Sequence, residues 1–246
     1  MTMKRYKYFL LALITFSLTI FEFRAVNFKF AFLGSTAVAQ TVNDRNAEAD
    51  RLFEQGNKQY DTNQYKQALQ FWEQSLAIYR EISNQQGIAN SLNNMGNAYR
   101  NLGDYRKAIN YHQQSLVIAK QIGNRSGIAK SLNNLGAAYR NLGDYRKGID
   151  YYQQSLKIAK KIENTFIVAT FLNNLGTTYK QLQEYENAKE NLYQAIAIWE
   201  NIRKLLRNQD TWKVSIFEKQ AHTYRSLQEV LVAQKQPLQA LEISER

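Results

Sequence analysis

Apolar residues recur at helical spacing through most of the chain, and the stretch from Ile88 to Ile122 shows the pattern most plainly. In its first part, steps of three and four residues separate Ile88, Leu92, Met95, Tyr99 and Leu102. These steps place the residues on one face of an α-helix. Gly103 ends that helix because glycine adopts the left-handed conformation without steric cost, and the Asp104 carboxylate can cap the next helix. The second part has the same period, so the stretch predicts two antiparallel helices joined by a tight turn.

This helical hairpin is repeated along the chain. Residues 91–109 read SLNNMGNAYRNLGDYRKAI, and residues 131–149 repeat that sequence with three substitutions. A weaker copy starts at Phe171, and a degenerate one surrounds Gly56. A fixed spacing of forty residues is typical of a stacked repeat array. We expect this array over 48–246, with units at 48–86, 87–126, 127–166 and 167–206, an insertion near 201–212, and a truncated fifth repeat to 246.

Two departures from the repeat bear on its stability. Gly148 stands where the preceding unit has Ala108. Glycine inside a helix costs about 0.5–1 kcal/mol relative to alanine, so Gly148→Ala is expected to raise the melting temperature. The fourth unit has Gln183-Glu184 where the second and third have Gly-Asp, so its turn is less strongly specified.

The repeated residues carry a family resemblance. Gly96, Tyr99, Gly103, Tyr105 and Ala108 stand in the order of the tetratricopeptide-repeat signature, and the next two units match it in turn. The spacing of forty is similar to that of the longer-helix subgroup that includes kinesin light chains. The resemblance implies an all-α fold, a right-handed α-solenoid of antiparallel helix pairs.

The C-terminal run LQEVLVAQKQPLQALEISER resembles the junction that precedes a caspase-like CHAT domain in bacterial repeat proteins. This second resemblance implies that the natural chain continues beyond Arg246 into a catalytic domain. A solenoid also needs a polar cap at its end, and the sequence up to Arg246 supplies none. The open C-terminal end is therefore expected to continue or to associate with another copy.

The N-terminal 39 residues have the three parts of an export signal. A short basic region precedes an apolar run from Phe9 to Phe21, and Ala37-Val38-Ala39 offers a small-residue cleavage site. The run is shorter than the roughly 20 residues that span a bilayer. We therefore expect residues 1–39 to be a signal peptide cleaved after Ala39, or an uncleaved membrane anchor within 9–33, and 40–47 to form a linker. Either arrangement places the repeats outside the cytoplasm, in the periplasm or the extracellular space.

Composition argues against several classes of site. The net charge of +11 falls to +7 when residues 1–39 are set aside, and the excess is spread without a basic block. The chain has no cysteine, so a thiolate nucleophile or thiolate metal site is excluded. Of its two histidines, His112 takes the position of Tyr152 one unit later and is expected to pack in the core, while His222 is expected on the helix surface. We expect no catalytic residue, metal or cofactor.

Polar residues occupy the other face of the first helix in each unit. In the family, this face lines a concave groove, so the resemblance implies that the polar residues bind a ligand. Stacking is expected to align Asn93, Asn133 and Asn173 in one column, and Arg100, Arg140 and Lys180 in another. Asparagine amides can hold a peptide backbone, and the cations favour an acidic partner. The expected groove residues are Asn90, Asn93, Asn94, Asn97, Arg100, Lys130, Asn133, Asn134, Arg140, Asn173, Asn174 and Lys180. The alternative is a solvated surface that recurs because the unit was duplicated.

These observations favour an exported scaffold that binds a protein or peptide and catalyses no reaction itself. The alternative from the enzyme class is the regulatory half of a truncated caspase-like (CHAT) protease or another hydrolase. RNA binding is less favoured, because it rests on a modest positive charge and conflicts with export. The sequence does not identify the partner.

Overall fold

The computed structural model describes residues 40–205 and 210–244, and every regular element in those ranges is a helix. This confirms the all-α prediction. The chain divides into two compact units, Met1–Glu48 and Ala49–Arg246. In the first unit, residues 40–48 are helical, so the segment expected as a linker is not an irregular one. The expected signal or anchor, residues 1–39, lies outside the described residues. None of the helices described is both long and apolar enough to cross a bilayer.

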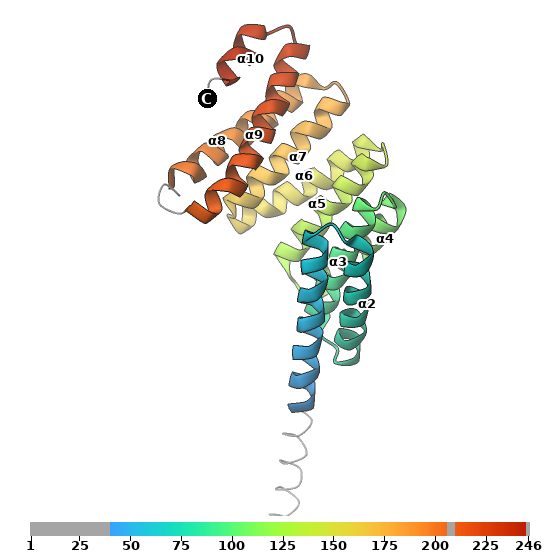
Figure 1. Cartoon of the computed structure of the whole chain (residues 1–246). Coiled ribbons are helices and arrows are strands. Elements are labelled where there is room, and N and C mark those ends of the chain that lie inside the picture. The colour runs from blue at the N-terminus through green and yellow to red at the C-terminus, as the bar shows by residue number, and fades with distance from the viewer. Residues whose placement is uncertain (1–39, 206–209, 245–246) are drawn as a thin grey trace, which may run out of the picture. The chain divides into compact units, whose positions relative to one another are not determined.

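The second unit is a row of helices in which each packs against the next (Figure 1). Residues 49–61 form its first helix. The others are α2 (Tyr65–Glu81), α3 (Gln85–Asn101), α4 (Tyr105–Gln121), α5 (Arg125–Asn141), α6 (Tyr145–Ile162), α7 (Thr165–Gln181), α8 (Tyr185–Leu205), α9 (Asp210–Ala233) and α10 (Pro237–Ser244). Alternate helices also contact one another, α3 with α5, α5 with α7, and α7 with α9. The helix pairs therefore stack as expected for a solenoid.

The turns and caps follow the sequence pattern closely. At the N-terminus of α4, the Asp104 carboxylate accepts a hydrogen bond from the Lys107 backbone N–H at 3.1 Å. Asparagine or aspartate caps α3, α5, α6 and α7 in the same way. The turn residue Gly103 has a φ of 83°, and Gln183 takes the same left-handed conformation with a φ of 61°. The fourth turn thus keeps its shape although a non-glycine residue pays a steric penalty there.

One contact recurs inside each of the first four hairpins, where a glycine of the first helix lies against a large side chain of the second. A Cβ built on Gly96 would lie 2.6 Å from the His112 ring, and one on Gly136 would lie 2.8 Å from Tyr152. Trp72 and Leu192 fill the corresponding places opposite Gly56 and Gly176. His112 is completely buried. The structure thereby confirms that His112 packs in the core.

The insertion before the fifth repeat lengthens helices. The helix α8 has 21 residues and α9 has 24, whereas α3, α4, α5 and α7 have 17 each. The pair α9 and α10 forms the fifth hairpin, and α10 has only 8 residues. At this end of the array Val232 and Leu238 expose 61% and 77% of their surface.

Candidate peptide-binding groove

The predicted groove residues lie on α3, α5 and α7, which are the first helices of consecutive repeats. Because these helices contact one another and α9 continues the series, their outward side chains form one surface. The helix of residues 49–61 is joined to α3 through Asn57 and Asn94, and we call the surface made by this helix, α3, α5, α7 and α9 the first-helix face. Most of the predicted residues on it are partly buried, whereas Asn90 and Lys130 are exposed.

The asparagines of this face are bonded to one another across the repeats. Asn94 Nδ2 donates to Asn57 Oδ1 at 2.9 Å. Asn134 Nδ2 donates to Asn93 Oδ1, and Asn174 Nδ2 donates to Asn133 Oδ1, both at 3.0 Å. We call this series, Asn57, Asn93, Asn94, Asn133, Asn134 and Asn174, the asparagine ladder. Each of these three hydrogen bonds is a rung of the ladder, and together the rungs join the first four repeats.

The ladder changes how the expected columns are interpreted. Asn93 and Asn133 do not simply repeat along the face, because each accepts from the second asparagine of the following unit. Each amide has two donor hydrogens and two acceptor lone pairs, so a rung uses only part of its capacity. The fixed amides can therefore still bind a ligand, and their orientation is set before the ligand arrives.

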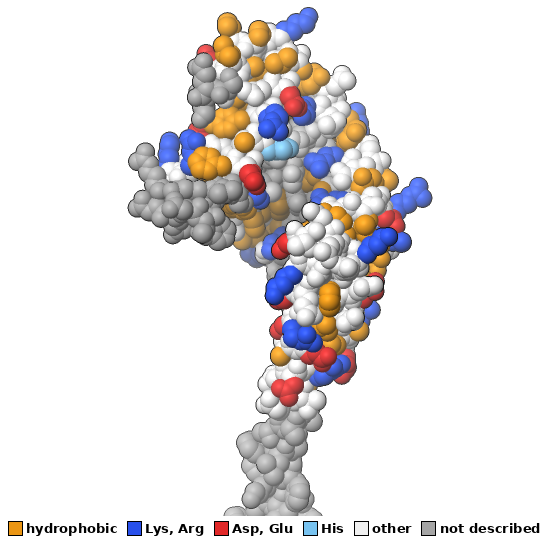
Figure 2. All heavy atoms as spheres, viewed as in Figure 1, with side chains coloured by type: hydrophobic (Ala, Val, Ile, Leu, Met, Phe, Trp, Pro, Cys, Tyr) orange, Lys and Arg blue, Asp and Glu red, His pale blue; other side chains and the backbone are white. Residues whose placement is uncertain are grey.

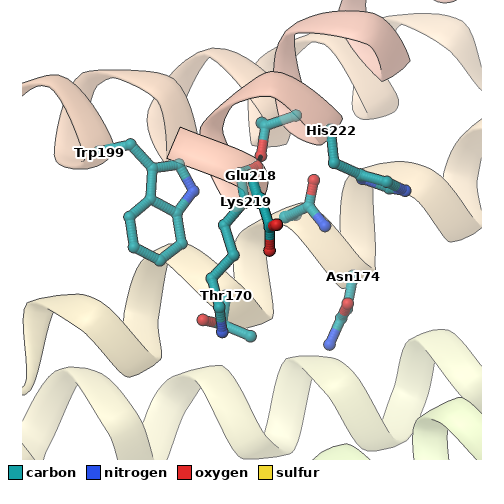
Figure 3. Close-up of a pocket in the computed structure, with 8 residues that line it drawn as sticks. Thr170, Asn174, Trp199, Glu218, Lys219 and His222 are labelled. Atoms are coloured by element: carbon teal, nitrogen blue, oxygen red, sulfur yellow. Dashed lines mark hydrogen bonds between the residues drawn. The ribbon is translucent and has the colours of Figure 1, made fainter. Parts of the chain in front are cut away.

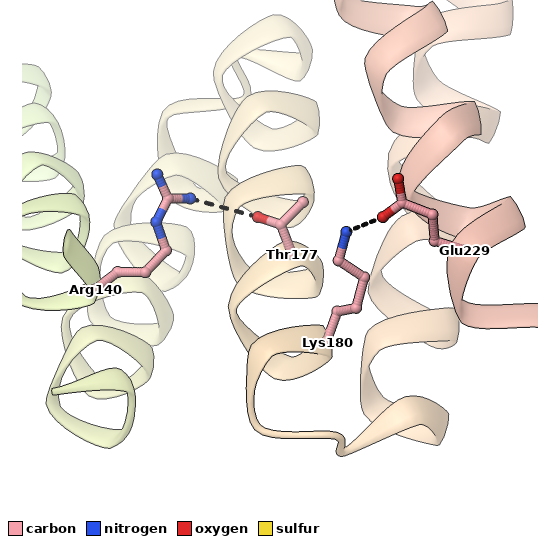
Figure 4. Close-up of polar contacts among 4 residues, drawn as sticks. All are labelled: Arg140, Thr177, Lys180 and Glu229. Atoms are coloured by element: carbon pink, nitrogen blue, oxygen red, sulfur yellow. Dashed lines mark hydrogen bonds and ion pairs between the residues drawn. The ribbon is translucent and has the colours of Figure 1, made fainter. Parts of the chain in front are cut away.

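The cation column is partly engaged within the protein (Figure 4). Arg140 on α5 lies 3.5 Å from Thr177 Oγ1 on α7, the outer limit of a hydrogen bond. Lys180 on α7 forms an ion pair with Glu229 on α9. Within the part of the chain that the structure describes, the Nε atom of Arg100 is buried and has no hydrogen-bond partner. The positive charge of the column is thus reduced at its C-terminal end.

Three hollows lie along the first-helix face. One, of ≈ 380 Å³, is lined by Glu54, Asn57, Tyr60, Asp61, Trp72, Asn94 and Asn97. A second, of ≈ 370 Å³, lies between α5, α7 and α9 and is lined by Arg140, Thr177, Lys180, Gln181, His222, Arg225, Ser226 and Glu229. Each is large enough for one or two side chains of a bound peptide.

The third hollow lies between α7, α8 and α9, and we call it the Trp199 pocket (Figure 3). It measures ≈ 350 Å³ and is lined by Thr170, Asn173, Asn174, Trp199, Glu218, Lys219, His222 and Thr223. His222 borders both this pocket and the second hollow. The sequence analysis predicted that His222 lies on the helix surface, and its side chain is exposed. That it borders the groove was not predicted, because the insertion changes the register of α9.

The described residues of the groove include several hydrogen-bonding side chains that could bind a ligand. Two features typical of a reactive site are a metal-binding cluster and a reactive histidine. Across residues 40–205 and 210–244, no three His, Asp or Glu side chains lie close enough together to hold a metal ion. Burial, and to a smaller extent the charge of Arg100, lowers the pKa of His112 to about 3. This imidazole is therefore neutral at physiological pH and enclosed in the core.

A family model described as Tetratricopeptide repeat matches residues 56–121, 87–161 and 127–201. No curated protein sequence matches the chain. Among solved structures, BtubC from P. vanneervenii is 19% identical, with 83% of this chain and 89% of that one covered and a TM-score of 0.59. A putative kinesin light chain with TPR-like repeats from Podosopora anserina is also 19% identical, with 81% and 93% covered and a TM-score of 0.63.

A signal transduction ATPase with a tetratricopeptide repeat sensor from Pyrococcus horikoshii gives a TM-score of 0.68 at 19% identity. This chain is covered over 82% of its length and the ATPase over 30%. At such identities the structures share the fold, and the CHAT junction expected from the C-terminal run stays a prediction. The overlapping matches together span 56–201, more than half of the sequence. The chain belongs to the tetratricopeptide-repeat family.

Proposed function

We propose that this array binds an extended peptide segment of a partner protein along the first-helix face. The observation that carries the proposal is the asparagine ladder, in which three rungs hold polar amides in fixed orientations on one continuous surface. A preorganised surface loses little side-chain entropy when a ligand binds. Hollows beside the rungs offer places for ligand side chains. Solenoids of this kind commonly bind on such a surface.

The charge of the groove favours a mildly acidic peptide. Lys130 is exposed, and Arg140 makes only a long hydrogen bond, so both can attract a carboxylate. Glu229 neutralises Lys180, however, and Figure 2 shows positive and negative side chains interspersed over the face it presents. Charge should therefore mainly speed association and set ligand orientation.

The proposal is tested by selecting peptides from a random displayed library with the purified chain, then measuring affinities by fluorescence anisotropy. The groove variant carries Asn97→Ala, Lys130→Ala and Arg140→Ala, three residues of the first-helix face outside the ladder. Loss of about one charge-assisted hydrogen bond should weaken binding about tenfold or more. Unchanged affinity in this variant would refute the proposed groove.

The matched control carries Gln113→Ala, Lys120→Ala and Lys160→Ala, which remove one amide and two cations from exposed positions on α4 and α6. It should bind like the natural sequence. Alanine at Asn93, Asn133 and Asn173 together would be a poorer test, because Asn93 and Asn133 accept rungs of the ladder. That variant would lose repeat stacking along with binding.

We also propose that the repeats are exported, on the strength of the basic region, the apolar run and Ala37-Val38-Ala39. Mass spectrometry of the protein isolated from its native cells distinguishes the two arrangements. A mature chain that begins at Gln40 supports cleavage after Ala39. An intact N-terminus in a membrane fraction supports the anchor, and an intact chain in the cytosol refutes export.

A further inference from the structure

The asparagine ladder stops at the fourth repeat and leaves an acceptor unused. Asn93 and Asn133 each accept from an asparagine of the next unit, and Asn173 is their counterpart on α7. Its Oδ1 atom is buried and finds no hydrogen-bond partner within the described residues. Buried polar atoms in native proteins are nearly always paired, so this atom needs an explanation.

The reason lies in the sequence of α9. Gln183 and Lys235 are the left-handed residues in the turns that follow α7 and α9, the first helices of the fourth and fifth repeats. Asn174 precedes Gln183 by nine residues, and Ser226 precedes Lys235 by the same nine. Ser226 therefore occupies the place from which an asparagine amide would reach back to Asn173. A serine hydroxyl is too short to replace that amide.

A second buried group without a partner lies close by. Trp199 is 1% exposed, and its indole Nε1 makes no hydrogen bond to any described residue. By contrast, Nε1 of Trp72 donates to the Phe53 carbonyl at 3.1 Å. The Trp199 ring is fixed edge-to-face against Phe166, with centroids 5.0 Å apart. The unused donor is thus held in one orientation rather than free to turn elsewhere.

Both groups line the Trp199 pocket. In Figure 3 the nitrogen-bearing edge of the Trp199 ring faces the space beneath α9. Thr170 and Thr223 also line the pocket, and so do the oppositely charged side chains of Glu218 and Lys219. A pocket with one buried donor, one buried acceptor and balanced charge fits a neutral group that both accepts and donates.

We infer that the Trp199 pocket binds the side-chain carboxamide of a glutamine or asparagine in the bound peptide. The ligand NH₂ donates to Asn173 Oδ1, and the ligand carbonyl accepts from Trp199 Nε1. The ligand thereby supplies the missing rung of the ladder, in the manner of Asn134 and Asn174 within the protein. A carboxylate has no hydrogen for Asn173, and a thioether offers neither a strong donor nor a strong acceptor. This inference rests on the peptide groove proposed above.

The test follows the indole N–H resonances of the ¹⁵N-labelled chain by NMR. Three capped tripeptides, acetyl-Gly-X-Gly-amide with X as glutamine, glutamate or methionine, are titrated separately. The glutamine tripeptide should move the Trp199 resonance saturably, with an affinity at least tenfold above those of the other two. The Trp72 resonance, whose donor is already bonded, serves as the internal control. No shift of Trp199, or equal shifts with all three tripeptides, would overturn the inference.

Two variants at the end of the ladder sharpen the test. Ser226→Asn should provide the missing amide from within the protein and abolish the response to the glutamine tripeptide. The second hollow borders Ser226 and gives the larger side chain room. Ser226→Ala, which provides no amide, should respond like the natural sequence. Asn173→Leu removes the acceptor and should weaken binding of the glutamine tripeptide at least tenfold. Ser226→Asn and Asn173→Leu thus test the same hydrogen bond from its two sides.

The inference and the proposed function can fail separately. If library-selected peptides bind at the groove while the Trp199 resonance stays unmoved, the carboxamide assignment is overturned and the groove stands. Ser226→Asn that binds the glutamine tripeptide as tightly as the natural sequence would likewise overturn the assignment, provided its circular dichroism spectrum is unchanged.

Discussion

Acidification should destabilise the array through His112. This imidazole is completely buried beneath Gly96. Its Nδ1 lies 3.2 Å from Asn93 Oδ1, and its Nε2 is buried with no hydrogen-bond partner in the described structure. A second proton on the ring would therefore bring an uncompensated charge into the core beside Arg100. These surroundings, burial above all, lower the pKa of His112 to about 3.

The size and sign of the effect follow from the two states of the chain. An unfolded histidine has a pKa of about 6.5, so between about pH 6.5 and pH 3 the unfolded state binds a proton that the folded state does not. Stability is therefore intact above that range and falls as the pH falls through it. Each pH unit is worth about 1.4 kcal/mol, so lowering the pH from 7 to 5 should cost about 2 kcal/mol.

Urea denaturation followed by circular dichroism, at pH 7 and at pH 5, measures this cost. The comparison variant is His112→Leu, because Leu192 takes the same position opposite Gly176 in the fourth repeat. Carboxylates titrate alike in both proteins, so their contribution cancels in the difference between the two pH dependences. Hydrogen exchange of the α3 and α4 amides localises the effect, since a repeat array need not unfold in one step. Equal pH dependences for the two proteins would refute the reasoning.

Three further changes test the fold. Gly148→Ala should raise the melting temperature, because alanine favours the helix over glycine by about 0.5–1 kcal/mol. The gain in stability should be smaller than that, because the new Cβ would lie 3.0 Å from the Gly136 carbonyl oxygen. A lower melting temperature in a thermal scan would show that α5 and α6 cannot move apart to admit the methyl group. Asp104→Ala should cost about 1 kcal/mol in urea denaturation through loss of the α4 cap, while Asp104→Asn keeps an N-cap acceptor and should cost much less; equal losses would contradict the capping role. Asn133→Leu should cost about 1 kcal/mol, because the partly buried amide of Asn174 loses its acceptor. An unchanged denaturation midpoint would mean that this hydrogen bond is not needed for stability.

The hairpins were predictable because their determinants are local. Helical spacing, the left-handed glycine at residue 103 and the Asp104 cap each act within a few residues, and the structure has all three. The position of His112 was predictable for a related reason. The repeat itself equates it with Tyr152, so one unit supplies a template for the next.

The groove was predictable only in part, because its geometry depends on how the repeats are stacked. The sequence pattern placed the asparagines on one face but gave no angle between the repeats, so it could not show that Asn134 reaches Asn93 across them. The contribution of α9 was missed for another reason. The insertion shifts its register, and the left-handed turn residue Lys235 is what identifies Ser226 as the counterpart of Asn174. The predicted groove residues themselves await the binding test.

The joints between successive repeats are not chemically alike. Neutral amide rungs link the first four units, whereas an ion pair between Lys180 and Glu229 links the fourth to the fifth. Dissolved salt screens partly exposed ion pairs and leaves neutral hydrogen bonds nearly unaffected. Ionic strength should therefore weaken the polar contact at the last joint first, while the buried cluster that includes Leu192, Ile196 and Leu231 still holds the fourth and fifth units together.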